Sequence, residues 1–142
     1  MKVIVDTAVW SLALRRGQLP NDPQVALLRE LIADGRVVLV GAVRQEILSG
    51  IRHIDQFERL KNYLRAFPNL DLIIEDYELA AEFYNTCRHQ GVQGANTDFL
   101  ICAVAARRRC GILTTDKDFE AFSKHIPVIL IRPADEVDGD LH

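Results

Sequence analysis

Four acidic residues of this 142-residue chain stand where an α/β protein could bring them together. Asp6 follows a short apolar run near the N-terminus, and Asp116 follows a similar run far along the chain. Glu46 and Asp98 lie within helical patterns. Carboxylates that converge repel one another, and a divalent cation is the usual way to offset that repulsion. The pattern therefore favours a carboxylate-bound Mg²⁺ or Mn²⁺ and, with it, phosphate chemistry.

The elements that must position these acids are short β-branched runs alternating with helical patterns. The runs are nearly continuously apolar, as expected for strands covered on both faces. The strands are expected at residues 3–5, 37–40, 72–74, 112–114 and 128–131. Such alternation implies right-handed crossovers and therefore a parallel sheet flanked by helices, in one domain.

The helices between these strands carry recognisable start and stop signals. Asp22 before Pro23 is typical of an N-cap, and Gly35 is placed to end that helix. Asp76 and Thr97 are expected to cap two later helices, which run to about residues 90 and 109. Further helices are expected at residues 43–50, 54–66 and 119–124.

Asp6 and Asp116 both stand at the ends of expected parallel strands. Ligands of open α/β sheets bind beyond the carboxyl ends of the strands, so this position favours a functional role. Asp6 alone could equally cap a helix that begins near Ala8, and the Thr7 hydroxyl could join a metal site or cap that helix.

Asp98 is the strongest individual candidate among the acids. At helical spacing it shares a face with Ile101, Cys102 and Ala105, which places it on the apolar, inward stripe of its helix. A buried carboxylate needs a partner, and a helix N-terminus alone seldom suffices. The spacing therefore predicts a cation or another ligand near Asp98.

Glu46 and Asp118 have alternatives that the sequence leaves open. Glu46 shares a helical face with Ala42 and Val43 and so leans inward, but a half-exposed surface glutamate fits the same spacing. Asp118 could cap the short final helix, which would leave Asp116 nearer the site.

Composition and charge narrow the function classes. The chain is 49% hydrophobic and 26% charged, typical of an ordinary globular protein, and its net charge is −3. No stretch approaches the roughly 20 apolar residues of a membrane span, so we expect no membrane association and a cytoplasmic location. Three cysteines without a CxxC spacing disfavour a zinc site or a disulfide framework. Scattered histidines disfavour a histidine-based nuclease, and neither a nucleophile elbow nor a phosphate loop is present.

Two basic clusters offer candidate RNA contacts despite the acidic balance. They consist of Arg15 with Arg16 and of Arg107, Arg108 and Arg109. Arginine side chains of this kind steer nucleic acids through phosphate contacts. The alternative is a solvated helix end, which in the second cluster also suits the helix dipole.

Four segments in this order resemble the PIN-domain nucleases and, within them, the VapC toxins of bacterial toxin–antitoxin pairs. The segments read VIVDTAVW at residues 3–10, QEILSG at 45–50, TDFLICA at 97–103 and LTTDKDF at 113–119. Each is weak alone, but their order and separation make a specific match over residues 2 to 132. Ala8 and Thr97 stand where the family often has Ser and Asn.

The resemblance implies a three-layer α/β/α fold over residues 1–132, followed by an acidic tail at 133–142. It also implies a Mg²⁺- or Mn²⁺-dependent endoribonuclease, a homodimer and a cognate VapB-like antitoxin. The implied catalytic and metal-binding residues are Asp6, Glu46, Asp98 and Asp116, with Asp118 as a further ligand candidate and Thr7 and Thr115 as supporting residues. Two alternatives remain: a PIN nuclease of RNA processing, and a non-catalytic PIN-like binding module.

Overall fold

The computed structural model describes residues 1–14 and 22–133, and its sheet is entirely parallel. Within these residues five strands form one sheet in the order β3-β2-β1-β4-β5. The expected parallel sheet of about five strands is therefore confirmed. The strands are β1 (Val3–Val5), β2 (Val37–Val40), β3 (Asn69–Leu70), β4 (Gly111–Leu113) and β5 (Ile129–Ile131).

Some expectations concern residues outside the described part of the chain. Arg15 and Arg16 fall in the first undescribed segment, at 15–21, and the acidic tail falls almost entirely in the second, at 134–142.

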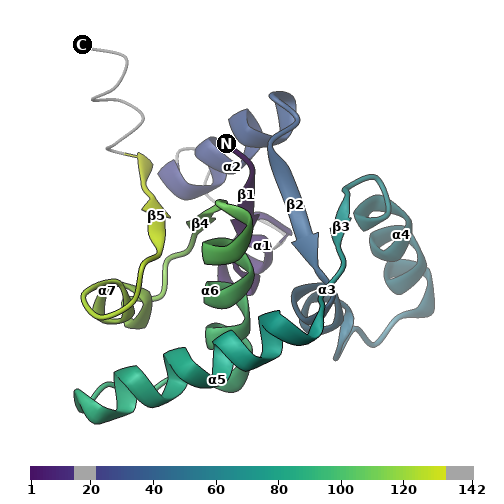
Figure 1. Ribbon diagram of the computed structural model, residues 1–142. Coiled ribbons are helices and arrows are strands. Elements are labelled where there is room, and N and C mark those ends of the chain that lie inside the picture. Colours follow the sequence, from purple (N-terminus) through teal and green to yellow (C-terminus); the bar gives the residue numbers. More distant parts are fainter. Residues whose placement is uncertain (15–21, 134–142) are drawn as a thin grey trace.

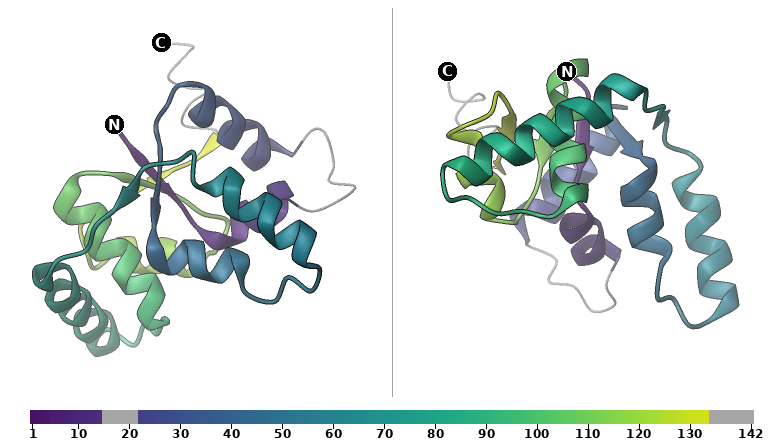
Figure 2. Two further views of the ribbon diagram at one scale, coloured as in Figure 1. Left: turned by 90° about the vertical axis from the view of Figure 1, so that its right-hand side faces the viewer. Right: turned by 60° about the horizontal axis from the view of Figure 1, so that its bottom comes forward.

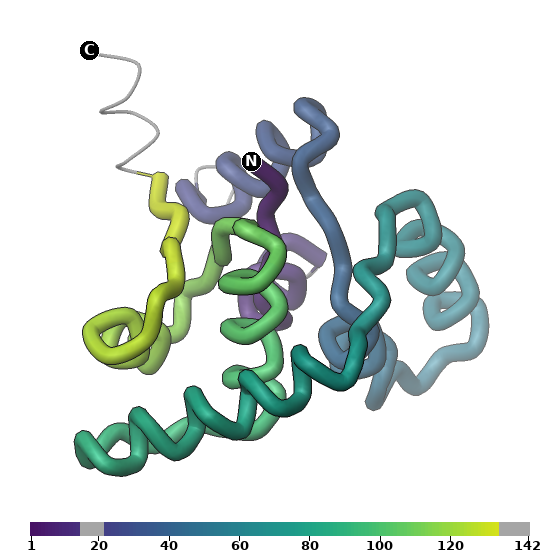
Figure 3. The backbone as a smooth tube through the Cα atoms, in the orientation of Figure 1, coloured from purple at the N-terminus to yellow at the C-terminus, as the bar shows by residue number. Residues whose placement is uncertain are grey.

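Helices lie on both faces of the sheet, giving three layers. In the left view of Figure 2, α5 and α6 lie on one side of the sheet, and α1, α2 and α4 lie on the other. The tube in Figure 3 follows the same path without the strand arrows. The helices are α1 (Thr7–Leu14), α2 (Pro23–Ala33), α3 (Gly41–Leu48), α4 (Ile54–Leu64), α5 (Ile74–His89), α6 (Asn96–Arg108) and α7 (Asp118–Ser123).

The three central strands form the middle of the core. Every residue of β1, β2 and β4 is buried, as their continuous apolar sequences predict. The edge strands β3 and β5 are more exposed, and Ile129 is about half exposed. All three cysteines are buried and free, and burial raises the pKa of the Cys102 thiol, which fits a core residue and not a nucleophile.

The expected strand at residues 72–74 is wrong. The sheet instead uses Asn69 and Leu70, and α5 begins at Ile74. The Asp76 carboxylate accepts the Ile73 backbone N–H, so Asp76 is the third residue of the helix and not its cap. Ile73 and Ile74 are exposed, at 44% and 72%, and are not core residues.

Smaller corrections concern the starts of three helices. The N-cap of α6 is Ala95 and not Thr97, because Asp98 accepts the Ala95 backbone N–H. Helix α3 begins at Gly41, two residues before the expected Val43. The N-cap of α7 is Lys117, so Asp118 is the first residue inside the helix. All three differences are of one or two residues, which is the ordinary spread of helix boundaries.

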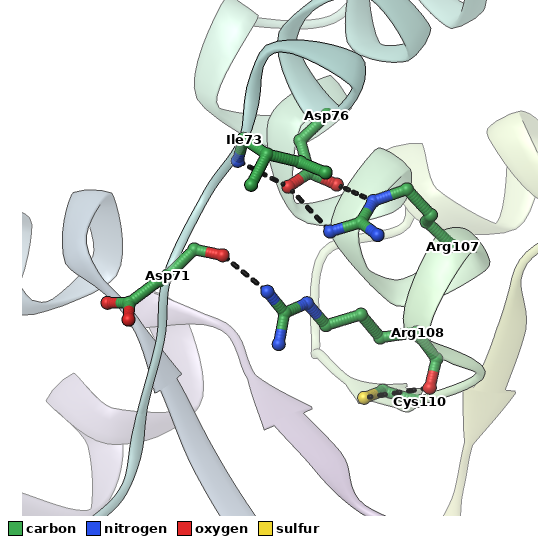
Figure 4. A network of polar contacts seen from close by, with 6 residues as sticks. All are labelled: Asp71, Ile73, Asp76, Arg107, Arg108 and Cys110. Carbon is green, nitrogen blue, oxygen red and sulfur yellow. Dashed lines mark hydrogen bonds and ion pairs between the residues drawn. The ribbon is translucent and has the colours of Figure 1, made fainter.

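A network of polar contacts fastens the start of α5 to the end of α6 (Figure 4). Arg107 donates to the buried Asp76 carboxylate through Nε at 2.5 Å and Nη2 at 3.0 Å. Arg108 donates to the Asp71 carbonyl oxygen. These contacts hold the pKa of Asp76 below its ordinary value, with the Arg107 hydrogen bonds as the main cause. Both guanidinium groups therefore have partners inside the protein. Neither the predicted RNA contact nor the alternative of a solvated helix end anticipated these partners.

No helix within residues 1–14 and 22–133 combines the length and the apolarity that a bilayer crossing needs.

Candidate active site

The candidate site lies where the strand order reverses, between β1 and β4. From β1 the chain adds β2 and β3 on one side, and it later adds β4 and β5 on the other. The crossover helices diverge at such a point and leave a crevice at the carboxyl ends of the two strands. Asp6 follows β1 and donates its backbone N–H to the Leu113 carbonyl of β4 at 2.9 Å. The segment from Thr114 to Asp116 follows β4 at the same edge.

Asp6 is a buried carboxylate at the centre of this edge, with 7% of its surface exposed. Its Oδ1 accepts the Thr7 backbone N–H at 2.8 Å, and its Oδ2 accepts the Thr114 hydroxyl at 2.9 Å. Burial nevertheless raises the pKa of Asp6, and repulsion from Asp116 and Glu46 adds to the rise. The two hydrogen bonds offset only part of this rise in pKa, so the surroundings of Asp6 disfavour its ionised form.

Thr114 is the supporting residue that the sequence interpretation missed. Its Oγ1 donates to Asp6 and also accepts the Asp116 backbone N–H at 3.0 Å, so one side chain connects the two acids. The expected supporting residue, Thr115, is instead exposed. The sequence alone carries no signal for this role, because it depends on the register of the sheet: Val5 pairs with Leu113, so Thr114 follows directly beside Asp6.

Asp98 approaches the same edge from α6, whose N-terminal end lies there (Figure 1). Its Oδ2 accepts the Ala95 backbone N–H at 3.2 Å. The expected inward stripe is present, because Ile101, Cys102 and Ala105 are all buried. Burial raises the pKa of Asp98 to about 6, and repulsion from Asp6, Asp116 and Asp118 contributes.

Asp116, and not Asp118, supports the start of α7, and the charge of Asp116 also acts on the site. The Asp116 carboxylate accepts the Asp118 backbone N–H at 2.9 Å, and its carbonyl accepts the Phe119 N–H at 3.2 Å. Asp116 therefore stabilises the start of α7 while its charge acts on both Asp6 and Asp98. Asp118 is exposed, and its charge acts on Asp98.

Glu46 lies on α3 with an exposed side chain, at the outer margin of the site. The inward face of that helix is held by Val43 and Ile47, which are buried. The charge of Glu46 still contributes to the raised pKa of Asp6, so Glu46 lies close enough to act on the site. All five candidate acids are thus in electrostatic contact, although they come from four separate parts of the chain.

These residues suit a hard divalent cation in chemistry and charge. The donors are carboxylate oxygens, which Mg²⁺ and Mn²⁺ prefer. The Thr7 hydroxyl beside Asp6 is buried without a hydrogen-bond partner, as expected of a group that awaits a ligand or its water. The described residues contain no group of three acids, histidines or cysteines already close enough to hold a metal.

The fold and the site together define an open, parallel α/β protein that gathers carboxylates at the switch point of its sheet. The family model of the PIN domain matches residues 3–125. The chain therefore belongs to the PIN-domain family, and the resemblance read from its four segments is confirmed.

Solved structures with the same fold include several complexes of toxin–antitoxin systems. FitAcB from Neisseria gonorrhoeae aligns with a TM-score of 0.71 and 23% identity, over 93% of this chain and 98% of that chain. VapBC2 from Rickettsia felis, bound to a DNA fragment from its promoter, aligns with a TM-score of 0.74 and 18% identity, over 92% and 98%. VapBC-5 from Mycobacterium tuberculosis, a member of the VapBC family of toxin–antitoxin systems, aligns with a TM-score of 0.67 and 22% identity, over 93% and 99%. Comparison with curated proteins gave no significant match.

Proposed function

We propose that this protein is a Mg²⁺- or Mn²⁺-dependent endoribonuclease and the toxin of a type II toxin–antitoxin module. The observation that carries the proposal is the convergence of Asp6, Glu46, Asp98 and Asp116 at the switch point of a PIN-domain sheet. Burial and neighbouring carboxylates raise the pKa values of Asp6 and Asp98, so keeping these two groups ionised is costly without a cation, and this cost supports a site that uses one.

The proposed roles of the acidic residues in metal binding and catalysis differ with their surroundings. Asp6, Asp98 and Asp116 would hold one cation, and Glu46 at the margin would place a second cation or the attacking water. A bound divalent ion supplies a water of lowered pKa and polarises the scissile phosphate, so no histidine base is needed. Thr114 keeps Asp6 oriented through its 2.9 Å hydrogen bond. In-line attack of water on phosphorus would leave a 5′-phosphate and a 3′-hydroxyl.

The proposed partners follow from the neighbouring structures. FitAB and VapBC2 are solved as complexes bound to DNA, and the Mycobacterium tuberculosis structure belongs to a toxin–antitoxin system. We propose that a cognate VapB-like antitoxin blocks the acidic site of this protein in the cytoplasm and that the protein forms a homodimer.

The deciding experiment compares cleavage of structured RNAs by the wild type, Asp6→Ala and Asp98→Ala, each with and without Mn²⁺. We expect cleavage only by the wild type with the metal. Glu30→Ala, an exposed substitution on α2, is the control and should cleave like the wild type. Metal-independent cleavage, or full activity of both site variants, contradicts the proposed mechanism. Induced expression should arrest bacterial growth, whereas normal growth despite cleavage in vitro would favour a nuclease of RNA processing.

A further inference from the structure

Gly94 lies in the loop between α5 and α6, one residue before the N-cap Ala95. Its φ is not in the left-handed region, unlike those of Gly35, Gly50 and Gly91. The backbone conformation therefore does not by itself require glycine at this position. The reason for glycine lies in the side chains that surround it.

Two aromatic rings leave no room for a side chain at Gly94. A Cβ atom there would clash with Cζ of Phe122 and would lie 2.9 Å from Cε1 of the same ring and 3.0 Å from Cε2 of Phe99. Both rings are buried, and their centroids are 4.6 Å apart. Neither ring can move aside without disturbing the core, so the loop packs directly against this aromatic pair, Phe99 and Phe122.

The loop at Gly94 is tied to Asp98 by hydrogen bonds. The backbone N–H of Ala95, the residue after Gly94, donates to Asp98 Oδ2 at 3.2 Å. The Ala95 carbonyl accepts the backbone N–H of Phe99, the residue after Asp98, at 3.3 Å. A displacement of the loop at Gly94 would therefore be transmitted to the Asp98 carboxylate.

Phe122 connects the same contact to the segment of Asp116. It lies in α7, whose first turn is held by the Asp116 carboxylate through the Asp118 N–H at 2.9 Å. It also packs on Phe119 of that turn, with ring centroids 5.2 Å apart. The aromatic pair thus connects the start of α6 with α7, and a candidate metal ligand stands at the start of each helix.

We propose that Gly94 is a positioning residue for the metal site. Because it has no side chain, the loop packs closely on the aromatic pair, and this contact sets the separation between the Asp98 and Asp116 carboxylates. Mg²⁺ demands near-ideal geometry from its oxygen ligands, so a small displacement of one carboxylate weakens binding. The inference rests on the proposed ribonuclease function, because it concerns the cation of the same site.

The test measures Mn²⁺ binding to the full-length protein by calorimetry in the wild type, Gly94→Ala, Phe122→Leu and the double variant. Gly94→Ala should weaken Mn²⁺ binding by about 10- to 100-fold, as for other changes to groups that orient metal ligands. Phe122→Leu loosens the contact without a clash and should weaken binding less. It also removes the ring atoms that the new methyl group would meet, so the double variant should bind Mn²⁺ more tightly than Gly94→Ala.

Gly41→Ala is the matched control. Gly41 begins α3, the helix that carries Glu46, but nothing lies within 4 Å of a Cβ added there. This variant should bind Mn²⁺ like the wild type.

A second set of readouts separates positioning from folding. Leu64→Ala, in the core at the end of α4, should lower the melting temperature and leave the Mn²⁺ affinity of the folded protein unchanged. Gly94→Ala should shift the backbone amide NMR signals of Asp98 and Asp118 in the metal-free protein, and the double variant should return them toward their wild-type positions. If Gly94→Ala does not fold, Phe122→Leu decides, and an unchanged Mn²⁺ affinity in that variant overturns the proposal.

The outcomes distinguish this inference from the proposed function. Wild-type Mn²⁺ affinity in Gly94→Ala, or a loss that the double variant does not reverse, would remove the positioning role and leave the ribonuclease proposal intact. Weakened Mn²⁺ binding in Gly94→Ala, without RNA cleavage by the wild type, would support the positioning role and count against the ribonuclease. A wild type that binds no Mn²⁺ would overturn both.

Discussion

At the scale of single residues, Asp98 lies in surroundings that disfavour its charge. Its pKa of about 6 in the folded protein stands above the ordinary 3.8, with desolvation as the largest cause. Between these values the folded protein binds more protons than the unfolded chain, so its stability falls as pH rises. The Asp98 contribution is most favourable below about pH 4 and is lost as pH rises through 6.

We therefore expect Asp98→Asn to stabilise the metal-free protein at pH 7. The amide oxygen can still accept the Ala95 N–H, while the costly charge is gone. After discounting for partial exposure, the gain should be about 1 kcal/mol at pH 7 and close to zero at pH 4. Urea unfolding in the presence of a chelator at both pH values measures it. An equal effect at the two pH values would show that the charge is not responsible.

Thr114 and its neighbour Thr115 allow a matched comparison of two threonine-to-valine substitutions. Thr114→Val removes the hydroxyl that joins Asp6 to the Asp116 backbone but keeps the shape of the side chain. We expect metal-dependent RNA cleavage to fall by about 10- to 100-fold, as for other residues that orient metal ligands. Thr115→Val, at an exposed side chain, should cleave like the wild type. Cleavage assays at several Mn²⁺ concentrations decide it, and similar activities of the two variants would contradict the role of Thr114.

At the scale of elements, the ion pair between Asp76 and Arg107 fastens α5 to α6. The Asp76 side chain is fully buried and the Arg107 side chain is 31% exposed, so Asp76→Ala leaves a partly solvated guanidinium without its partner and should lower the free energy of unfolding at pH 7. Because the pKa of Asp76 is lowered in the folded protein, its contribution is present above about pH 4 and is lost as pH falls through the folded-state pKa. The difference between the two proteins should therefore shrink in acid.

Urea unfolding at pH 7 and pH 3 tests this, with Asp71→Ala as the control. Asp71 receives Arg108 through its backbone carbonyl, so loss of its side chain leaves that hydrogen bond in place. A loss of stability in Asp71→Ala as large as in Asp76→Ala would show that the ion pair is not the cause.

The same network explains why the strand predicted at residues 72–74 is absent from the sheet. The apolar run at residues 72–74 fits a strand by composition, since periodicity cannot separate a short strand from a helix start. Asp76 decides the matter by binding both the Ile73 N–H and Arg107, a residue 31 positions away. Contacts across that distance in sequence leave no local signal. The central strands could be predicted without such contacts, because their continuous apolar composition requires burial on both faces.

The site was predictable to the extent that it depends on strand ends and helix faces. Asp6 and Asp116 could be placed from the rule for parallel sheets, and Asp98 from its apolar stripe. Thr114 required the register of β1 against β4, and the exposed position of Glu46 required the packing of α3, which buries Val43 and Ile47. Both depend on how elements pack and not on which residues form them.

At the scale of the whole molecule, the acidic balance and the site are connected. The net charge is −3, and one bound divalent cation would offset two of those charges at the point where they are most concentrated. The acidic composition is thus compatible with an RNA substrate once the cation is bound. The proposed metal should also act on global stability, because it would bind the folded site and not the dispersed carboxylates of the unfolded chain.

We expect Mn²⁺ to raise the melting temperature of the wild type, by an amount equivalent to about 2.7 kcal/mol at a hundredfold excess over its Kd. Asp6→Asn should lose this shift because it removes the central buried carboxylate. Asp98→Asn should begin from a more stable metal-free state and gain little. Glu30→Gln, at an exposed position on α2, should retain the full shift. Thermal unfolding with and without Mn²⁺ measures all four proteins, and an unchanged shift in Asp6→Asn would place the cation elsewhere.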